Sequence, residues 1–247
     1  EFYQFESNEL EKLTISGTEN LSGWWNCVYP VDINNDGLQD FVLGNLGKNY
    51  KYQAPMKIYG GDIDGDGDVE SLLSYFESNK EYPVKGREDL LEELHYLKDR
   101  LPTYKSYAEK TFSEIFPESE LTSVLKKEAK TFNSGILINK GDLKFDFKPL
   151  PDEVQGSSVN ACSIFEYEGK RFLVLGGNKY NLEVETARID GSYGALLEVV
   201  GDDLIYMDNS KSGFQFQGEV KQIISTENGF IVGRNSGPLE VYRPNSG

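Results

Sequence analysis

Two acidic loops, thirty residues apart, constrain the fold of this chain more than any other feature. Residues 32–40 and 62–70 each place an oxygen-bearing side chain at positions 1, 3, 5 and 9 and a glycine at position 6. Short apolar and aromatic runs precede and follow each loop, which predicts a β-strand on either side. The repeated unit is therefore strand, acidic loop, strand.

These loops form two candidate cation sites. Closely spaced carboxylates repel one another unless a cation joins them, and Ca²⁺ accepts irregular sets of oxygen ligands better than Mg²⁺ does. The glycine lets the chain turn sharply enough for the oxygens to converge. We predict two calcium ions, with a structural role. The alternative is a pair of solvated acidic turns, because Asp and Gly favour turns without any metal. With position 7 included, the candidate ligands are Asp32, Asn34, Asp36, Leu38 and Asp40 in the first loop, and Asp62, Asp64, Asp66, Asp68 and Glu70 in the second.

The loops differ from EF-hands in two respects. An EF-hand needs a bidentate carboxylate at position 12 and a helix on each side. Position 12 is Leu43 in the first loop and Leu73 in the second, and the flanking runs read as strands. We therefore expect position 9 to supply the last side-chain ligand.

Two weaker copies of the unit follow later in the chain. Residues 168–176 align without gaps to residues 36–44, but Ile164 and Phe172 stand where the first loop has Asp32 and Asp40. This predicts an ordinary hairpin turn without metal. The copy at residues 223–233 contains an Asn-Gly pair, which is a strong signal for a tight hairpin. Recurring short strands with turn signals favour a repeat architecture, with the propeller blade as the natural unit.

One segment, residues 86–130, has a helical pattern instead. Its leucines recur at helical spacing, Pro102 ends the first predicted helix, and Thr103 is placed to cap the second. A third, shorter helix is predicted to include Leu121, Val124 and Leu125. The predicted fold of residues 1–247 is all-β: a β-propeller, or the C-terminal part of one with about four to five blades, with an α-helical insertion at 86–130. The leucines of the first helix are Leu90, Leu91, Leu94, Leu97 and Leu101.

Charge and composition limit the partners. The net charge is −16, from 25 basic and 41 acidic residues, and such a surface repels phosphate backbones, so we expect no nucleic acid. No apolar run is long enough to span a bilayer, so no transmembrane segment is expected in this fragment. Cys27 and Cys162 pair or stay free; the sequence does not decide between these. Weak Ca²⁺ sites fill only where the ion is at millimolar levels, which favours an extracytoplasmic location.

The acidic unit resembles the FG-GAP/VCBS repeat of integrin-α-type β-propellers. The order of segments is most similar to the C-terminal region of bacterial surface proteins related to cartilage acidic protein. Residues 56–62, 82–90, 139–142, 177–180 and 188–194 carry this resemblance. It implies a surface or outer-membrane-associated protein with a non-catalytic role.

Abundant carboxylates leave a glycosidase-type acid pair open to this chain, whereas catalysis that depends on several histidines is not available. His95 is its only histidine, so neither a His-dependent triad nor a zinc site with several histidines is available. Trp24 and Trp25 are candidates for stacking on a sugar or anchoring a partner, with core packing as the alternative. A long polar connection supplies further candidate contacts, with a self-packed loop in which Arg188 and Asp190 pair with neighbouring charges as the alternative. These candidates are Asn178, Tyr180, Arg188, Asp190 and Tyr193.

Two functions fit this sequence. We expect a monomeric, non-enzymatic calcium-binding propeller module that binds a protein or glycan partner at the cell surface. The rival is a Ca²⁺-dependent carbohydrate-active enzyme, such as a lyase, acting on a polysaccharide. An enzyme needs a concave site with convergent acid and base groups away from the two loops, so the presence of such a pocket discriminates between them.

Overall fold

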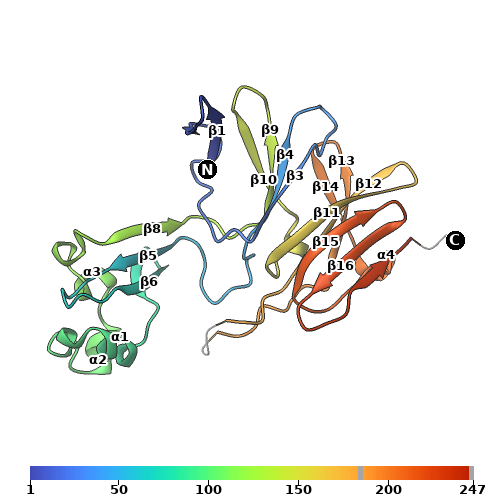
Figure 1. The fold of residues 1–247 in the computed structure, drawn as a ribbon. Helices are drawn as coiled ribbons and strands as arrows, with labels where there is room; N and C mark the ends of the chain where they lie inside the picture. The colour runs from blue at the N-terminus through green and yellow to red at the C-terminus, as the bar shows by residue number, and fades with distance from the viewer. Residues whose placement is uncertain (183–185, 245–247) are drawn as a thin grey trace. The chain divides into compact units, whose positions relative to one another are not determined.

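The computed structural model describes residues 1–182 and 186–244, and the chain divides into two compact units (Figure 1). Residues 1–51 and 132–247 form the first unit, and residues 52–131 form the second. The second unit is inserted between β4 and β9, two strands that pair in the first unit. Strands predominate over helices in the described residues, which confirms the all-β class.

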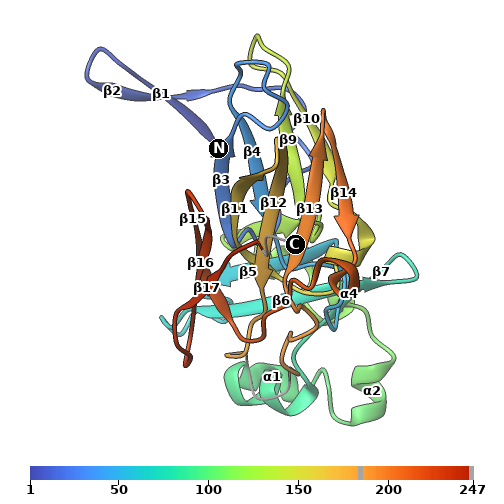
Figure 2. The ribbon, with the colours of Figure 1, turned by 90° about the vertical axis from the view of Figure 1, so that its right-hand side faces the viewer.

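The first unit contains three antiparallel sheets of three or four strands, in which strands consecutive within the unit lie side by side. The first strand of each sheet is an edge strand, and β11 lies beside both β3 and β15 (Figure 2). The first sheet contains β3 (Cys27–Val31), β4 (Asp40–Gly44), β9 (Gly135–Asn139) and β10 (Phe145–Pro149). The second sheet contains β11 (Val159–Tyr167), β12 (Lys170–Gly177), β13 (Ala195–Val200) and β14 (Asp203–Met207). The third sheet contains β15 (Val220–Thr226), β16 (Gly229–Arg234) and β17 (Glu240–Tyr242).

These sheets pack on one another through alternating side chains. Leu173 and Val174 are adjacent in β12 and both fully buried, because successive side chains of a strand point to opposite faces. Leu173 belongs to the core cluster shared with Val42 of the first sheet, and Val174 to the cluster shared with Val232 of the third. The second sheet is therefore buried on both faces.

Shorter elements complete the first unit. The hairpin of β1 (Phe2–Glu6) and β2 (Glu9–Leu13) is a separate two-stranded sheet. Its Phe2 ring packs on those of Phe41 and Phe145, with ring centroids 5.6 and 5.1 Å apart. The helical turns are η3 (Asp152–Val154) and α4 (Asn209–Ser212).

The repeat copies at 164–176 and 223–233 are hairpins, as the sequence predicts. Glu168 and Gly169 join β11 to β12 with φ values of 49° and 74°, the positive values that a two-residue type I′ turn requires. Two residues also join β15 to β16. Within the described residues the sheets do not close into a ring, and the first unit has three sheets of three or four strands rather than four or five blades. The fourth large sheet belongs to the second unit.

The second unit is a four-stranded sheet with helical segments in the connection between β7 and β8. Its spatial order is β7-β6-β5-β8, from β5 (Met56–Gly61), β6 (Glu70–Glu77), β7 (Lys80–Pro83) and β8 (Leu125–Ala129). The helical segments are α1 (Arg87–Glu93), η1 (His95–Lys98), α2 (Tyr104–Ala108), α3 (Phe112–Ile115) and η2 (Glu118–Leu121). All five predicted leucines are buried in a core that also contains Tyr59 and Leu72 of the sheet.

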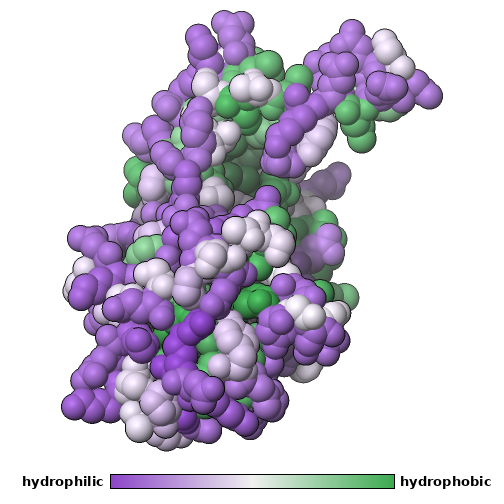
Figure 3. Space-filling model, turned by 90° about the vertical axis from the view of Figure 1, so that its left-hand side faces the viewer, coloured by the Kyte–Doolittle hydropathy of each residue, from purple (hydrophilic) through white to green (hydrophobic). Residues whose placement is uncertain are grey.

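The surface turned toward the viewer in Figure 3 is mostly hydrophilic, with scattered hydrophobic groups.

The helical segments begin at Arg87 and end at Leu121, and they belong to a larger compact unit that starts at residue 52, because β5 and β6 share a core with them. The last part of the predicted helical insertion is wrong. Residues 125–129, expected in or after a third helix, form β8, which pairs with the free edge of β5. Backbone pairing along that edge outweighs the helical preference of the Lys and Glu residues in this segment. Thr103 caps α2 as predicted, accepting a hydrogen bond of 3.1 Å from the Ser106 N–H.

Candidate metal centre

The two acidic loops connect paired strands, β3 to β4 and β5 to β6, and share a hydrogen-bonding pattern. In each, the backbone N–H at position 2 donates to the carboxylate at position 9. Ile33 donates to Asp40 at 2.9 Å, and Ile63 donates to Glu70 at 2.8 Å. Both carboxylates are buried and lie at the first residue of the second strand. In both loops, the carboxylate at position 9 is thus held beneath the loop by a hydrogen bond from the backbone.

The glycine at position 6 has the role that the sequence predicts. Gly37 and Gly67 have φ values of 85° and 98°, which other residues adopt only with strain. This conformation aims each backbone N–H at the carboxylate of position 1. Gly37 donates to Asp32 at 2.9 Å and Gly67 to Asp62 at 3.1 Å.

The second loop brings three carboxylates together. One carboxylate oxygen from each of Asp62, Asp64 and Glu70 lies within 4.8 Å of the other two. Asp62 and Asp64 are exposed, whereas Glu70 is buried at the base of the loop. Ionised carboxylates at this spacing suit a hard cation, and a Ca²⁺ ion takes its remaining ligands from water and carbonyl oxygens. Asp66 and Asp68, also predicted as ligands, are exposed and stand outside this cluster.

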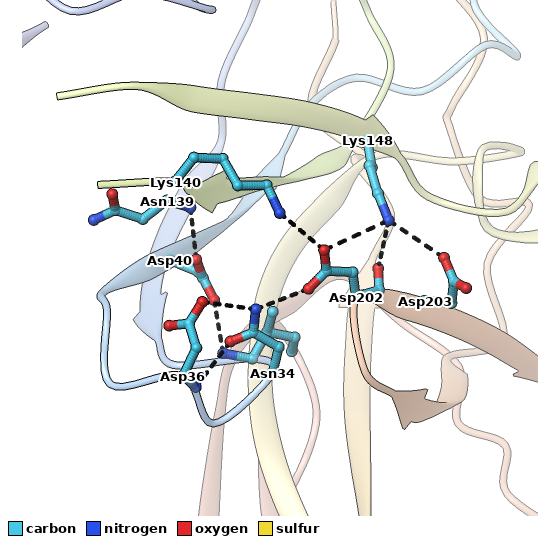
Figure 4. A network of polar contacts seen from close by, with 9 residues as sticks. Asn34, Asp36, Asp40, Asn139, Lys140, Lys148, Asp202 and Asp203 are labelled. Carbon is cyan, nitrogen blue, oxygen red and sulfur yellow. Dashed lines mark hydrogen bonds and ion pairs between the residues drawn. The ribbon is translucent and has the colours of Figure 1, made fainter. Parts of the chain in front are cut away.

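The first loop is arranged differently. Within residues 1–182 and 186–244 a cluster of three carboxylates occurs only in the second loop. In the first, the Asn34 amide donates to Asp36 at 2.9 Å and to Asp202, in the turn between β13 and β14, at 2.8 Å (Figure 4). Leu38 offers only its backbone carbonyl, and its N–H donates to Asp36 at 2.8 Å.

Asp40 is the most enclosed carboxylate of the first loop. Burial raises its pKa, and the nearby Asp36 and Asp32 carboxylates act in the same direction. The backbone N–H groups of Asn139, at 2.7 Å, and Ile33 oppose this rise. A cation beside Asp40 would favour its ionised form, which is the electrostatic benefit that Ca²⁺ offers this loop.

Two basic residues lie near the first loop, Lys140 directly after β9 and Arg171 in β12. Lys140 donates to Asp202 at 2.9 Å, and this bond lowers the pKa of Asp202 (Figure 4). Arg171 of β12 donates to the carbonyl oxygens of Asp32 and Ile33 at 3.0 and 2.9 Å. Sequence reasoning missed Lys140, Arg171 and Asp202, because each lies at least 100 positions from the loop and no local pattern connects them to it.

Both tryptophans pack against other aromatic rings. Trp24 lies between Tyr50 and Phe132, with ring centroids 5.7 and 5.0 Å away. Trp25 packs against Phe147 at 6.3 Å, and its indole N–H donates to the Leu21 carbonyl at 2.8 Å. Both are partly buried, so the structure places them closer to the core alternative than to an open stacking platform.

Asn178 is buried and unsuited to contact a partner directly. Its side chain accepts from the Ser157 hydroxyl at 2.8 Å and the Ser192 N–H at 2.9 Å. It donates to the carbonyl oxygens of Ser192 and Gly218 at 2.8 and 3.0 Å. Every hydrogen-bonding position of the amide is used, so Asn178 holds the loop after β12 in place.

The other residues of this connection are more accessible. The Arg188 guanidinium lies 5.3 Å from the centre of the Tyr180 ring, a cation–π contact. Asp190 is exposed, and Tyr193 is 51% exposed. Tyr193 lies at a pocket of about 110 Å³ that also has Glu153, Ser192, Tyr206 and Asn209 in its wall. Glu153 is the only carboxylate among the described residues that line this pocket, whereas a glycosidase-type mechanism needs two.

In the described part of the chain no helix is long and apolar enough to cross a membrane. Comparison with protein-family models and with curated protein sequences finds no match. The site therefore has to be interpreted from its own geometry and chemistry.

Proposed function

We propose that this chain is a non-enzymatic Ca²⁺-binding module of a bacterial surface protein, in which Ca²⁺ stabilises loops that join β-strands. The observation that carries this proposal is the convergence of Asp62, Asp64 and Glu70 within 4.8 Å. The first loop repeats its backbone pattern and is the second proposed site. There, Ca²⁺ binding requires the Asn34 amide to turn its oxygen toward the ion, which would break its bonds to Asp36 and Asp202.

We further propose that the three sheets of the first unit are an open arc of propeller-type blades, as in FG-GAP/VCBS repeat proteins. The support is their antiparallel order, the burial of the second sheet on both faces and the proximity of β3, β11 and β15. Propeller blades have this arrangement, with the first strand of each sheet nearest the centre. A surface module of this kind binds a protein or glycan partner through its loops, and the exposed Tyr193 ring beside its pocket is a suitable stacking surface.

Thermal unfolding tests the metal proposal. We expect millimolar Ca²⁺ to raise the melting temperature relative to excess EDTA, because the native loops bind the ion and the unfolded chain does not. We expect Mg²⁺ to raise it much less, because Mg²⁺ accepts irregular sets of oxygen ligands less well than Ca²⁺ does. At a Ca²⁺ concentration about 100-fold above the dissociation constant, the free energy of unfolding rises by about 3 kcal/mol. Equal melting in EDTA and in Ca²⁺ would rule out the proposal.

Variants locate the effect within the second unit. Asp64→Asn removes a charge from the cluster, and we expect it to reduce the Ca²⁺-induced rise. The matched control is Asp99→Asn, which removes the same charge from an exposed residue of the same unit, outside the loop. If both variants respond to Ca²⁺ equally, the cluster is not the binding site.

A further inference from the structure

Cys27 and Cys162, the only cysteines of the chain, pack in the same core cluster, on two strands of different sheets that contact each other. Cys27 is the first residue of β3, and Cys162 lies in the middle of β11. No disulfide joins the two cysteines, and each thiol is the largest influence on the pKa of the other. Both belong to the core between the first and second sheets, with Cys162 buried and Cys27 partly exposed.

A glycine makes this approach possible. Gly44 is the cross-strand partner of Cys27 in β4, and a Cβ atom there would lie 2.5 Å from the Cys27 sulfur and 2.3 Å from the Val159 carbonyl oxygen. The Cys27 sulfur uses this space and lies 3.8 Å from the Val159 carbonyl oxygen. A second contact between β3 and β11 lies further along the strands, where the Ile164 N–H donates to the Tyr29 hydroxyl at 3.5 Å. The two edge strands thus run together on both sides of the thiol pair.

We propose that Cys27 and Cys162 form a dithiol site that reacts with low-molecular-weight disulfides and closes into a covalent link between the first and second sheets. Cys27 is the attacking residue, because it is the more exposed of the two. The neighbouring Cys162 thiol lowers the pKa of Cys27, burial opposes this, and the Gly44 backbone lowers the pKa further. The Cys27 thiol and burial raise the pKa of Cys162, which keeps Cys162 protonated while Cys27 makes the first attack.

The chemistry is balanced thiol–disulfide exchange. The Cys27 thiolate attacks one sulfur of the small disulfide, breaks its S–S bond and releases one thiolate, leaving a mixed disulfide on Cys27. Cys162 then loses its proton and attacks the Cys27 sulfur, which releases the second small thiol. The two cysteines are oxidised by two electrons, the small disulfide is reduced to two thiols, and these thiols carry away both protons.

Glutathione disulfide is the probe, applied to the reduced, folded full-length chain. We expect the wild type to lose two hydrogens in intact mass, to retain no glutathione, and to give a proteolytic peptide that links Cys27 to Cys162. We also expect oxidation to raise its melting temperature, reversibly with dithiothreitol. Two free thiols after exposure, or glutathione retained on the wild type, would overturn the proposal.

Serine variants test the order of attack. Cys162→Ser is expected to stop at the mixed disulfide and retain glutathione on Cys27, whereas Cys27→Ser is expected to stay unmodified while folded. Equal rates of modification of the two variants would contradict the assignment of Cys27 as the attacking thiol. Peptide mapping of the wild type still decides whether the link forms if either variant fails to fold.

Discussion

Glu81 of β7 is a partly buried carboxylate that three hydrogen-bond donors stabilise in its charged form. It accepts from Ser74 at 2.5 Å, Tyr59 at 2.7 Å and Lys57 at 2.9 Å. Burial by itself raises the pKa of Glu81, but these hydrogen bonds outweigh the effect of burial, so the pKa of Glu81 lies below its ordinary value of 4.5. They join three strands of the second unit, β5, β6 and β7.

This shift predicts a pH-dependent contribution to stability. A lowered pKa means that the contribution is fully present above pH 4.5 and is lost as the pH falls through the lower folded-state value. We expect Glu81→Gln to lower the free energy of unfolding by about 2 kcal/mol at neutral pH, and by less in acid. Urea unfolding across this range measures the difference. Glu77→Gln, at an exposed site of the same sheet, is the control and is expected to change little.

At the scale of elements, a short helical layer supplies much of the core of the second unit. Leu97 of η1 is fully buried, whereas Leu125 of β8 is 61% exposed. We expect Leu97→Ala to destabilise the protein by about 3 kcal/mol, because it leaves a cavity, and Leu125→Ala by less than about 1 kcal/mol. Chemical denaturation of the two matched variants measures this. Similar losses would mean that the helical layer does not pack as described.

Polar contacts of Asp202 connect the turn between β13 and β14 to the first acidic loop and to Lys140. Asp202 interacts with Lys140 at 2.9 Å and with Asn34 at 2.8 Å, whereas Asp203 has only a longer contact of 3.4 Å to Lys148. We expect Asp202→Ala to cost about 1 kcal/mol at low ionic strength and less at high salt, since exposed ion pairs are screened. Asp203→Ala is the neighbouring control. An Asp202→Ala effect that is the same at both salt concentrations would argue against an electrostatic link.

At the scale of the whole molecule, the chain is one unit interrupted by another. The core of the second unit is drawn entirely from residues 52–131. We expect residues 52–131 expressed alone to unfold in a single cooperative transition, because a core of this kind supports independent folding. Circular dichroism during heating measures this. A gradual loss of signal would show that the second unit depends on the first.

Local features were predictable from the sequence. The strand–loop–strand units, the turning glycines, the hairpins at 168–169 and 227–228 and the Thr103 cap all follow from residues a few positions apart. The same local patterns singled out the three carboxylates that converge in the second loop, Asp62, Asp64 and Glu70. The patterns failed at residues 125–129, where a segment rich in Lys and Glu pairs with β5, whose residues lie 65 to 73 positions earlier in the chain. The fold of the intervening residues, and not any local pattern, brings these two strands together.

The sequence by itself determined that this chain is all-β, acidic, and built around two carboxylate-dense turns, because side-chain periodicity and turn chemistry act over a few residues. Only the tertiary structure decided where the inserted unit begins, that Asn178 is buried, that Asp202 reaches Asn34 across 168 positions, and that Cys27 meets Cys162. These contacts depend on which faces of the sheets pack together. Such packing is set by the fit of whole surfaces, which no short stretch of sequence contains.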